Sequence, residues 1–339
     1  MQESDSPAPS EPVPSEPAPS EVSQVRSLAE LIQRMRGEIG RVIIGQDVVI
    51  DEVLAALLAG GHVLLEGKPG LGKTQLVNAL AKTFGGVSAR IQFTPDLMPS
   101  DVTGFRLFDM QSQTFQLRRG PVFTNLLLAD EINRAPAKTQ AALLEVMQEQ
   151  QVTIDGETLK LAPPFMTLAT QNPVEHEGTY PLPEAQLDRF IMKVLIGYPA
   201  QAAECEIVTR SAAETLGGGM ASVNLVCGPA EIIAAQRATA AVQVVGEVVA
   251  YAVAIAQATR DSRSISLGAG TRGAISLVRI GKAYAALNAR DYVTPDDIKK
   301  ASLPVLRHRV QLTPEVAISG QEVDDVLRTI VDSVAAPRG

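Results

Sequence analysis

The sequence of 339 residues has no tryptophan, two cysteines and three histidines, and aromatic residues make up only 4% of it. With so few aromatic rings, there is little for the bases of single-stranded nucleic acid to stack on. Cys205 and Cys227 form no CxxC pair and the histidines are scattered, so the sequence predicts neither a disulfide framework nor a cysteine–histidine metal site. A reduced, cytoplasmic setting is the simplest interpretation.

Positive charge is also scarce. The formal net charge is −8, which argues against a broad basic face for binding nucleic acid. Residues 1–25 contain five acidic residues and neither Lys nor Arg, with six prolines among the first twenty positions. This composition predicts a disordered tail, with a partner-binding arm as the alternative. The tail lacks the basic start and apolar core of a signal peptide.

Long apolar runs are missing, with one near exception at residues 238–258. Gly246 interrupts this run and Glu247 lies in its middle, where a charged carboxylate in a membrane helix costs roughly 2.5–3.5 kcal/mol. The sequence therefore predicts two packed helices and no membrane insertion.

Short apolar runs alternate with helical patterns between residues 41 and 198. The runs lie at residues 62–66, 126–129 and 165–169. Each has the length of a buried strand and is followed by turn or helix residues, which predicts a parallel sheet covered by helices on both faces. After Tyr198-Pro199 the pattern becomes helical and Ala-rich. We therefore expect an α/β domain at 26–200 and a helical domain at 201–339.

A glycine-rich loop follows the first predicted strand. It consists of Gly67, Lys68, Pro69, Gly70, Leu71, Gly72, Lys73 and Thr74. The glycines allow backbone N–H groups to close around the β- and γ-phosphates of ATP, while Lys73 adds a positive charge and Thr74 offers its hydroxyl to Mg²⁺. The strand–loop–helix setting favours a nucleotide site over a glycine-rich turn without a ligand.

Two adjacent carboxylates, Asp130 and Glu131, end the second predicted strand. We expect Asp130 to hold Mg²⁺ through its water shell, and Glu131 to orient and polarise the attacking water. Solvated acids at a strand end are common, but together with the glycine-rich loop the pair predicts ATP hydrolysis. Asn172 follows the third predicted strand and is a candidate for positioning the water, with an Asn-Pro turn as the alternative.

Arg189 follows a proline-rich loop, in Leu187-Asp188-Arg189-Phe190. A guanidinium that reaches the phosphates held by a neighbouring subunit offsets the charge that develops in the transition state, so hydrolysis would depend on assembly. A surface salt bridge is the alternative for a single arginine.

In this order, the motifs resemble those of AAA+ ATPases and, within them, the MoxR family, over roughly residues 25–335. The other motifs that carry the resemblance are Ile44-Gly45-Gln46, Ile91-Gln92-Phe93-Thr94-Pro95-Asp96-Leu97, Asp130-Glu131-Ile132-Asn133-Arg134-Ala135, Ala169-Thr170-Gln171-Asn172-Pro173 and Gly178-Thr179-Tyr180-Pro181-Leu182-Pro183-Glu184-Ala185-Gln186-Leu187-Asp188-Arg189-Phe190. The resemblance implies an α/β P-loop AAA+ core, with a parallel sheet between helices, followed by a small all-α lid domain. It also places Gly45 and Gln46 at the entrance to the nucleotide site, and makes Arg189 a trans-acting arginine finger.

Gly268-Ala269-Gly270-Thr271-Arg272 resembles the sensor-2 motif of the lid, which makes Arg272 a second phosphate-facing arginine. The family usually has Ser-Pro before this arginine and Ala after it, where this sequence has Gly270-Thr271 and Gly273. Glycine in the first turn weakens a helix by up to ~1 kcal/mol relative to alanine. Whether Arg272 faces its own ATP or that of a neighbour stays open at this point.

The resemblance also implies the function. MoxR-like proteins are ring-forming ATPases that remodel or mature partner proteins, which implies ATP and Mg²⁺ as cofactors, a homo-oligomer in the form of a hexameric ring, and client proteins that often carry von Willebrand A domains. Residues 101–120 would form an insert within the second helix region. Residues 151–161 alternate apolar and polar side chains around Asp155-Gly156 and predict a β-hairpin, which would face a pore or client or serve packing alone.

Three other functions share this fold. They are a magnesium-chelatase-like subunit, a DNA-directed motor and a nucleotide-sensing scaffold that does not hydrolyse ATP. The net negative charge of the chain disfavours the DNA-directed motor. The catalytic set of Lys73, Asp130, Glu131, Asn172 and Arg189 disfavours the scaffold.

Overall fold

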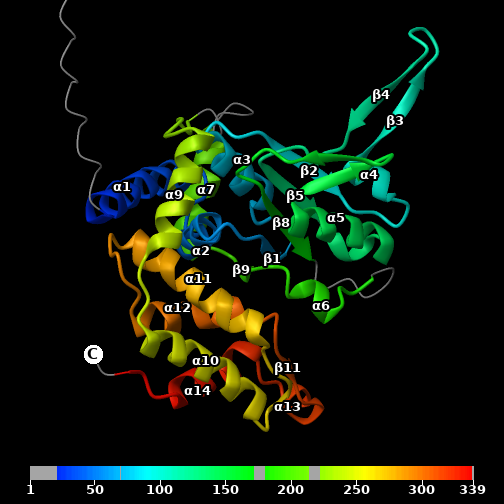
Figure 1. Cartoon of the computed structure of the whole chain (residues 1–339). Coiled ribbons are helices and arrows are strands. Elements are labelled where there is room, and N and C mark those ends of the chain that lie inside the picture. The colour runs from blue at the N-terminus through cyan, green and yellow to red at the C-terminus, as the bar shows by residue number, and fades with distance from the viewer. Residues whose placement is uncertain (1–20, 69, 172–179, 214–221, 338–339) are drawn as a thin grey trace, which may run out of the picture.

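The computed structural model describes residues 21–68, 70–171, 180–213 and 222–337 (Figure 1). Residues 1–20 of the predicted tail lie outside this part of the chain. Helix α1 (Glu21–Gly40) includes residues 21–25, so the prediction of disorder is wrong for these five positions. The reason is apolar burial near the start of this helix, because Val25 and Leu28 are both buried and Leu28 belongs to an apolar core.

A parallel sheet of five strands forms the centre of the α/β domain, as predicted. In spatial order its strands are β2 (Ser88–Gln92), β5 (Leu126–Asp130), β8 (Met166–Gln171), β1 (Val63–Gly67) and β9 (Met192–Ile196). Side chains alternate along a strand, so Val63 and Leu65 enter one apolar core while Leu64 enters the other. Burial on both faces explains why the central strands are mostly apolar, with Thr167 and Thr170 of β8 as buried exceptions.

Helices cover both faces of this sheet (Figure 1). The core on the Val63 side is completed by α1, α2 (Asp47–Leu58) and α3 (Lys73–Thr83), and the core on the Leu64 side by α5 (Ala137–Glu149). The short helices in the connections are α4 (Pro99–Thr103), the 3₁₀ turn η1 (Ile132–Arg134) and α6 (Glu184–Leu187).

Two antiparallel hairpins extend from the α/β domain where the sequence predicts an insert and a hairpin. They are formed by β3 (Gly104–Asp109) with β4 (Thr114–Arg119), and by β6 (Gln151–Ile154) with β7 (Glu157–Lys160). The β3–β4 hairpin projects away from the body of the molecule (Figure 1). Arg106 on β3 forms an ion pair with Glu157 on β7, so the two hairpins are tied together near the base of the first.

Helices predominate after β9, as predicted. They are α7 (Gln201–Ala213), α9 (Pro229–Ala241), α10 (Gly246–Asp261), α11 (Thr271–Leu287), α12 (Pro295–Leu306), α13 (Pro314–Ile318) and α14 (Val323–Ser333), with a small antiparallel pair of strands, β10 (Ile265–Leu267) and β11 (Gln311–Leu312). The apolar stretch at 238–258 is split between α9 and α10, as expected.

The helical part packs directly on the α/β domain. The apolar core on the Val63 side of the sheet continues without a break into α10, α11 and α12, so the domain boundary near residue 200 stays a prediction. Thr294 caps α12 by accepting a hydrogen bond from the backbone of Asp297. In the described part of the chain, no helix has the length and apolar character needed to cross a membrane.

Candidate nucleotide site and arginine cavity

A cavity of about 330 Å³ lies at the carboxyl end of the parallel sheet, where open α/β sheets bind their ligands. From the glycine-rich loop it is lined by Gly67, Gly70, Gly72, Lys73 and Thr74. Polar residues at the ends of β2, β5 and β8 complete the lining. The structure thus brings the loop and both predicted acids, Asp130 and Glu131, into one site.

The loop joins β1 to α3 in a conformation that needs its glycines. Gly70 and Gly72 have φ values of +84° and +78°, a region that residues with a Cβ atom rarely adopt. A Cβ atom on Gly67 would lie 2.6 Å from the carbonyl oxygen of Ile196 on β9. Helix α3 begins at Lys73, so the N–H groups of its first turn and its dipole lie beside the cavity, as an anion site requires.

Lys73 lies half-buried inside the site. Its Nζ donates a hydrogen bond to the Gly67 carbonyl at 2.5 Å. Burial lowers the pKa of Lys73, and the carboxylates of Asp130, Glu131 and Glu66 oppose this shift. Each of these acids also has a basic partner of its own, because Asp130, Glu131 and Glu66 form ion pairs with Arg90, Arg134 and Lys193 respectively.

Asp130 is held on both carboxylate oxygens. Thr170 Oγ1 donates to Oδ1 at 2.5 Å, and Arg90 Nη2 donates to Oδ2 at 2.6 Å. The Asp130 side chain is 16% exposed, so it faces the cavity with a fixed orientation. Together with the Thr74 hydroxyl it supplies the oxygen ligands that Mg²⁺ prefers.

Glu131 is fixed in both backbone and side chain. Its φ is +55°, and its N–H donates to Thr170 Oγ1 at 2.8 Å. Its Oε2 accepts hydrogen bonds from Gln92 Nε2 at 2.7 Å and from Arg134 Nη1 at 3.0 Å. The strained backbone and these donors aim one carboxylate into the cavity, as a water-activating base requires.

Sequence reasoning missed the roles of Arg90, Gln92 and Thr170. Arg90 and Gln92 are two residues apart on β2 and therefore point to the same face. The register places Gln92 opposite Asp130, which brings both side chains to the acids. The alternation of side chains along β2 can be seen in the sequence. That β2 lies beside β5 depends on the strand order of the sheet, which the sequence does not show.

The remaining predicted nucleotide residues lie beside the cavity. Gly45 has a φ of +70°, and a Cβ atom there would be 2.5 Å from the Cβ of Ala203 on α7. Gln46 Nε2 donates to the Gly197 carbonyl at 2.8 Å. This segment therefore connects the N-terminus of α2 to the chain that leaves β9, next to the glycine-rich loop.

Two further loop residues have structural contacts. Lys68 Nζ lies 5.2 Å from the centre of the Tyr198 ring, and Leu71 packs against the apolar core. Pro69 and Asn172 lie outside the residues that the structure describes. Their predicted roles in binding phosphate and positioning water therefore stay predictions.

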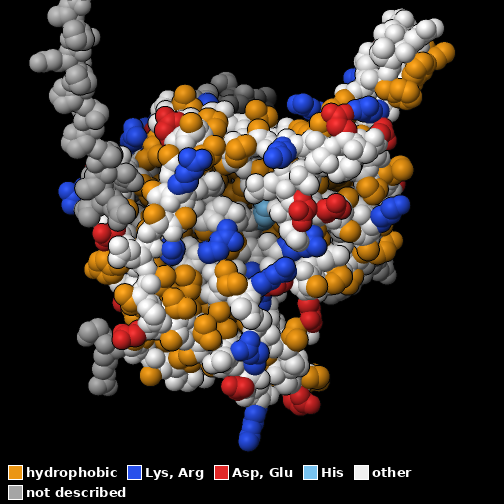
Figure 2. Space-filling view, in the orientation of Figure 1, with side chains coloured by type: hydrophobic (Ala, Val, Ile, Leu, Met, Phe, Trp, Pro, Cys, Tyr) orange, Lys and Arg blue, Asp and Glu red, His pale blue; other side chains and the backbone are white. Residues whose placement is uncertain are grey.

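Arg189 and Arg272 line a second cavity, of about 340 Å³, together with Arg279 and Arg309. Among the described residues of its lining, Asp188 carries the only carboxylate. Figure 2 shows Lys and Arg side chains gathered near the middle of the face that it displays, between the α/β domain and the C-terminal helical part. The second cavity thus has the charge of an anion-binding surface.

The two cavities lie at opposite ends of the sheet. Gly67 ends β1 in the first cavity, whereas Gly61 precedes β1 and lines the second. Strand β9 runs parallel to β1 with Met192 opposite Val63, so Arg189 lies at the same end as Gly61. A strand of five residues is roughly 16 Å long, which is beyond the reach of an arginine side chain. Arg189 is therefore too far from the glycine-rich loop of its own chain.

The glycine-rich loop, the paired acids and the helical lid define a P-loop nucleotide-binding protein of the AAA class. Residues 62–192 match the ATPase family associated with various cellular activities (AAA), and residues 257–330 match the AAA lid domain. This assignment confirms the predicted α/β core with a helical lid. The chain belongs to the MoxR family of AAA+ ATPases, as its relatives show.

These relatives match along nearly their whole length. Chaperone MoxR1 of Mycobacterium tuberculosis is 41% identical over 91% of this chain and 82% of its own, and protein MoxR of Methylorubrum extorquens is 31% identical over 90% and 94%. YeaC, an uncharacterised protein of Bacillus subtilis, is 45% identical over 91% and 96%. A solved structure of a candidate ATPase from Cytophaga hutchinsonii superposes with a TM-score of 0.86 at 41% identity, covering 93% of this chain and 97% of its own.

Proposed function

We propose that this chain hydrolyses ATP in a homo-oligomeric ring, with each active site shared between two subunits. The observation that carries the proposal is the separation of the two cavities along the sheet. The glycine-rich loop and the acids would form one half of a hydrolysis site. Arg189 and Arg272, which line the cavity at the other end of the sheet, would form the other half and serve the ATP of a neighbouring subunit. A ring, hexameric by family resemblance, brings the two halves of neighbouring subunits together.

Within the shared site, Lys73 and the N-terminus of α3 would bind the phosphates. Thr74 and Asp130 would hold Mg²⁺, which when bound neutralises charge on the phosphates. Glu131 would orient the attacking water and accept its proton. Arg189 and Arg272 of the next subunit would offset the charge that develops during transfer.

Turnover should require both Mg²⁺ and assembly. We expect the purified chain to release phosphate from ATP with Mg²⁺ and not with excess EDTA. Activity per chain should rise with protein concentration over the range in which analytical ultracentrifugation shows monomers combining. Equal activity per chain in monomers and assemblies would contradict the shared site, while leaving hydrolysis itself established.

We further infer that the ATPase acts on protein clients. One relative is named a chaperone, and the projecting β3–β4 hairpin exposes large apolar side chains. These are Phe105, Leu107, Phe108, Met110 and Phe115. Exposed apolar side chains, such as the Phe108 and Phe115 rings in contact across the hairpin, are typical of protein interaction sites. The family resemblance implies that such clients often carry von Willebrand A domains. A cytoplasmic location is consistent with such a role and stays a prediction.

Removing apolar side chains from the hairpin should separate client binding from basal hydrolysis. The double variant Leu107→Ser, Phe115→Ser is expected to keep basal ATPase activity within about twofold, because the hairpin lies outside both cavities. It should lose partners that the parent chain retains in ATP, as compared by pull-down and mass spectrometry. Gln116→Ser, on the same strand, is the matched control. Identical partner sets with and without the double substitution would exclude the hairpin as the client contact.

A further inference from the structure

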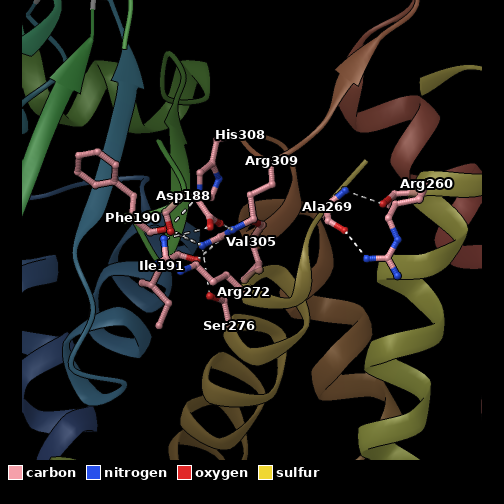
Figure 3. A network of polar contacts seen from close by, with 11 residues as sticks. Asp188, Phe190, Ile191, Arg260, Ala269, Arg272, Ser276, Val305, His308 and Arg309 are labelled. Carbon is pink, nitrogen blue, oxygen red and sulfur yellow. Dashed lines mark hydrogen bonds and ion pairs between the residues drawn. The ribbon is translucent and has the colours of Figure 1, made fainter. Parts of the chain in front are cut away.

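Arg309, in the turn after α12, is a lid residue whose side chain is buried against the α/β domain, with 7% of its surface exposed. A guanidinium has five N–H donors, and here each has an acceptor (Figure 3). Its Nε donates to Asp188 Oδ1 at 2.8 Å. Its Nη1 donates to the carbonyl oxygens of Ile191, at 3.1 Å, and Val305. Its Nη2 donates to the Phe190 carbonyl oxygen at 2.7 Å and to Ser276 Oγ at 3.2 Å. Such complete satisfaction fixes the positions of all groups involved.

Three of these acceptors surround Arg189 in the sequence. Asp188 precedes it, and Phe190 and Ile191 follow it, so Arg309 holds the backbone of the turn that presents Arg189 to the second cavity. His308 adds a further contact, because its Nε2 lies 3.0 Å from the Phe190 carbonyl. The turn is thus fastened to the lid by two consecutive lid residues.

The same guanidinium is connected to the helix that carries Arg272. Ser276, which accepts from Nη2 of Arg309, lies one turn after Arg272 on α11. Asp188 joins both arginines, since one of its oxygens bonds to Arg309 and the other lies 3.6 Å from Nη1 of Arg272. One lid side chain therefore contacts both elements that present arginines to the cavity.

The first turn of α11 packs beside the Arg309 side chain. A Cβ atom at Gly273 would lie 3.5 Å from Cδ of Arg309, which is an ordinary van der Waals contact, and 3.2 Å from the Cβ of Ala269. Glycine at this position is therefore not required by Arg309.

Burial of a guanidinium has a cost that its partners must offset. Burial lowers the pKa of Arg309, and the hydrogen bond and charge of Asp188 oppose this shift. Buried ion pairs often give no more stability than apolar residues of the same volume, whereas removing one partner is strongly destabilising. Fixing the geometry of a functional turn is a role that an apolar residue in the same place could not perform.

We propose that Arg309 is a positioning residue that locks Arg189 and Arg272 into one unit, which acts on the ATP of the neighbouring subunit. This inference rests on the proposed shared site. It adds a physical link between the lid and the arginine finger, because a displacement of the α11–α12 region would move the finger turn with it.

The variant Arg309→Lys tests this link. Lysine keeps the charge but has its donors on a single nitrogen, so it cannot bond to both sides of the turn and to α11 together. We expect kcat to fall by on the order of 100-fold, as a small misplacement of catalytic groups does. The affinity of the chain's own glycine-rich loop for a fluorescent ATP analogue should stay close to that of the parent.

Mixing experiments distinguish positioning from a general structural role. Glu131→Gln subunits carry an intact finger and Arg309→Lys subunits an intact Glu131, so mixtures of the two should recover part of the lost turnover. Mixtures of Arg309→Lys with Arg189→Ala should recover none, because both lack a working finger. A chain that is merely destabilised by the substitution would not show this pattern.

Arg307→Lys is the matched control. Arg307 is also a lid arginine with 9% side-chain exposure, and it pairs with Asp324 at 2.9 Å and donates to the Lys193 carbonyl at 3.2 Å. It thus fastens the lid to β9 without contacting the finger turn. We expect a similar loss in the temperature of unfolding for both lysine variants but near-parent kcat for Arg307→Lys.

If Arg309→Lys fails to fold, Asp188→Asn takes its place. The amide keeps an oxygen for Arg309 but removes the charge that joins Arg309 to Arg272, so kcat should fall by on the order of tenfold, again with recovery by Glu131→Gln subunits. A parent-like kcat in the folded variants would overturn the role of Arg309. The role would also be overturned if Glu131→Gln subunits restored the activity of Arg189→Ala but not that of the Arg309 or Asp188 variant. If Arg189→Ala is not restored either, the shared site itself is wrong.

Discussion

Replacing Glu131 with glutamine is expected to stop ATP turnover while ATP binding is retained. The amide has nearly the same shape as the carboxylate but cannot accept a proton from the attacking water. Loss of a general base typically costs on the order of 10²–10⁴-fold in rate. Binding should persist because Lys73, the glycines of the loop and the N-terminus of α3 are untouched by the change.

The hydrogen bonds around residue 131 should survive the substitution. Gln92 and Arg134 both donate to Glu131 Oε2, and the amide oxygen of glutamine can still accept from them. The backbone bond from residue 131 to Thr170 is independent of the side chain. The substitution should therefore change the chemistry of one group and leave the geometry of the site in place.

Phosphate release and binding of a fluorescent ATP analogue measure the two expectations separately. Glu145→Gln, in an exposed position on α5, removes the same charge away from both cavities and should keep parent activity. Turnover of Glu131→Gln within a few-fold of the parent would show that another group activates the water. Loss of binding would instead place Glu131 among the groups that hold the nucleotide.

The sequence predicts the centre of the sheet better than its edges, for a physical reason. β1, β5 and β8 are buried on both faces and stand out as apolar runs. β2 lies at an edge, and its exposed or half-exposed residues include Arg90 and Gln92, so it has no apolar run to mark it. Yet these two side chains contact Asp130 and Glu131, which means that the least visible strand contributes polar groups to the site.

The two halves of the proposed shared site also differ in how well the sequence predicts them. The glycine-rich loop and the two acids are local patterns, whose chemistry follows from adjacent residues. Arg309 has no such pattern, because its partner Asp188 is distant in the chain and its other acceptors are mostly backbone carbonyls. Contacts of this kind arise only when the lid packs on the α/β domain, so no local pattern in the sequence predicts them.

Replacing Arg189 with alanine is expected to lower kcat by on the order of 10³–10⁵-fold, the effect of losing an arginine finger. Nucleotide binding by the same chain should be spared, because Arg189 lies at the far end of the sheet from the glycine-rich loop. Arg328→Ala removes an exposed lid arginine that pairs with Asp325, and it should leave activity near that of the parent.

Mixtures of Arg189→Ala and Glu131→Gln subunits give this prediction its sharpest form. An active interface needs Glu131 from one subunit and Arg189 from the next, and each variant supplies what the other lacks. Recovered phosphate release should therefore peak near equal mixing and vanish with either variant alone. If the arginine acted within its own chain, no mixture would contain a complete site, and activity would stay absent at every ratio.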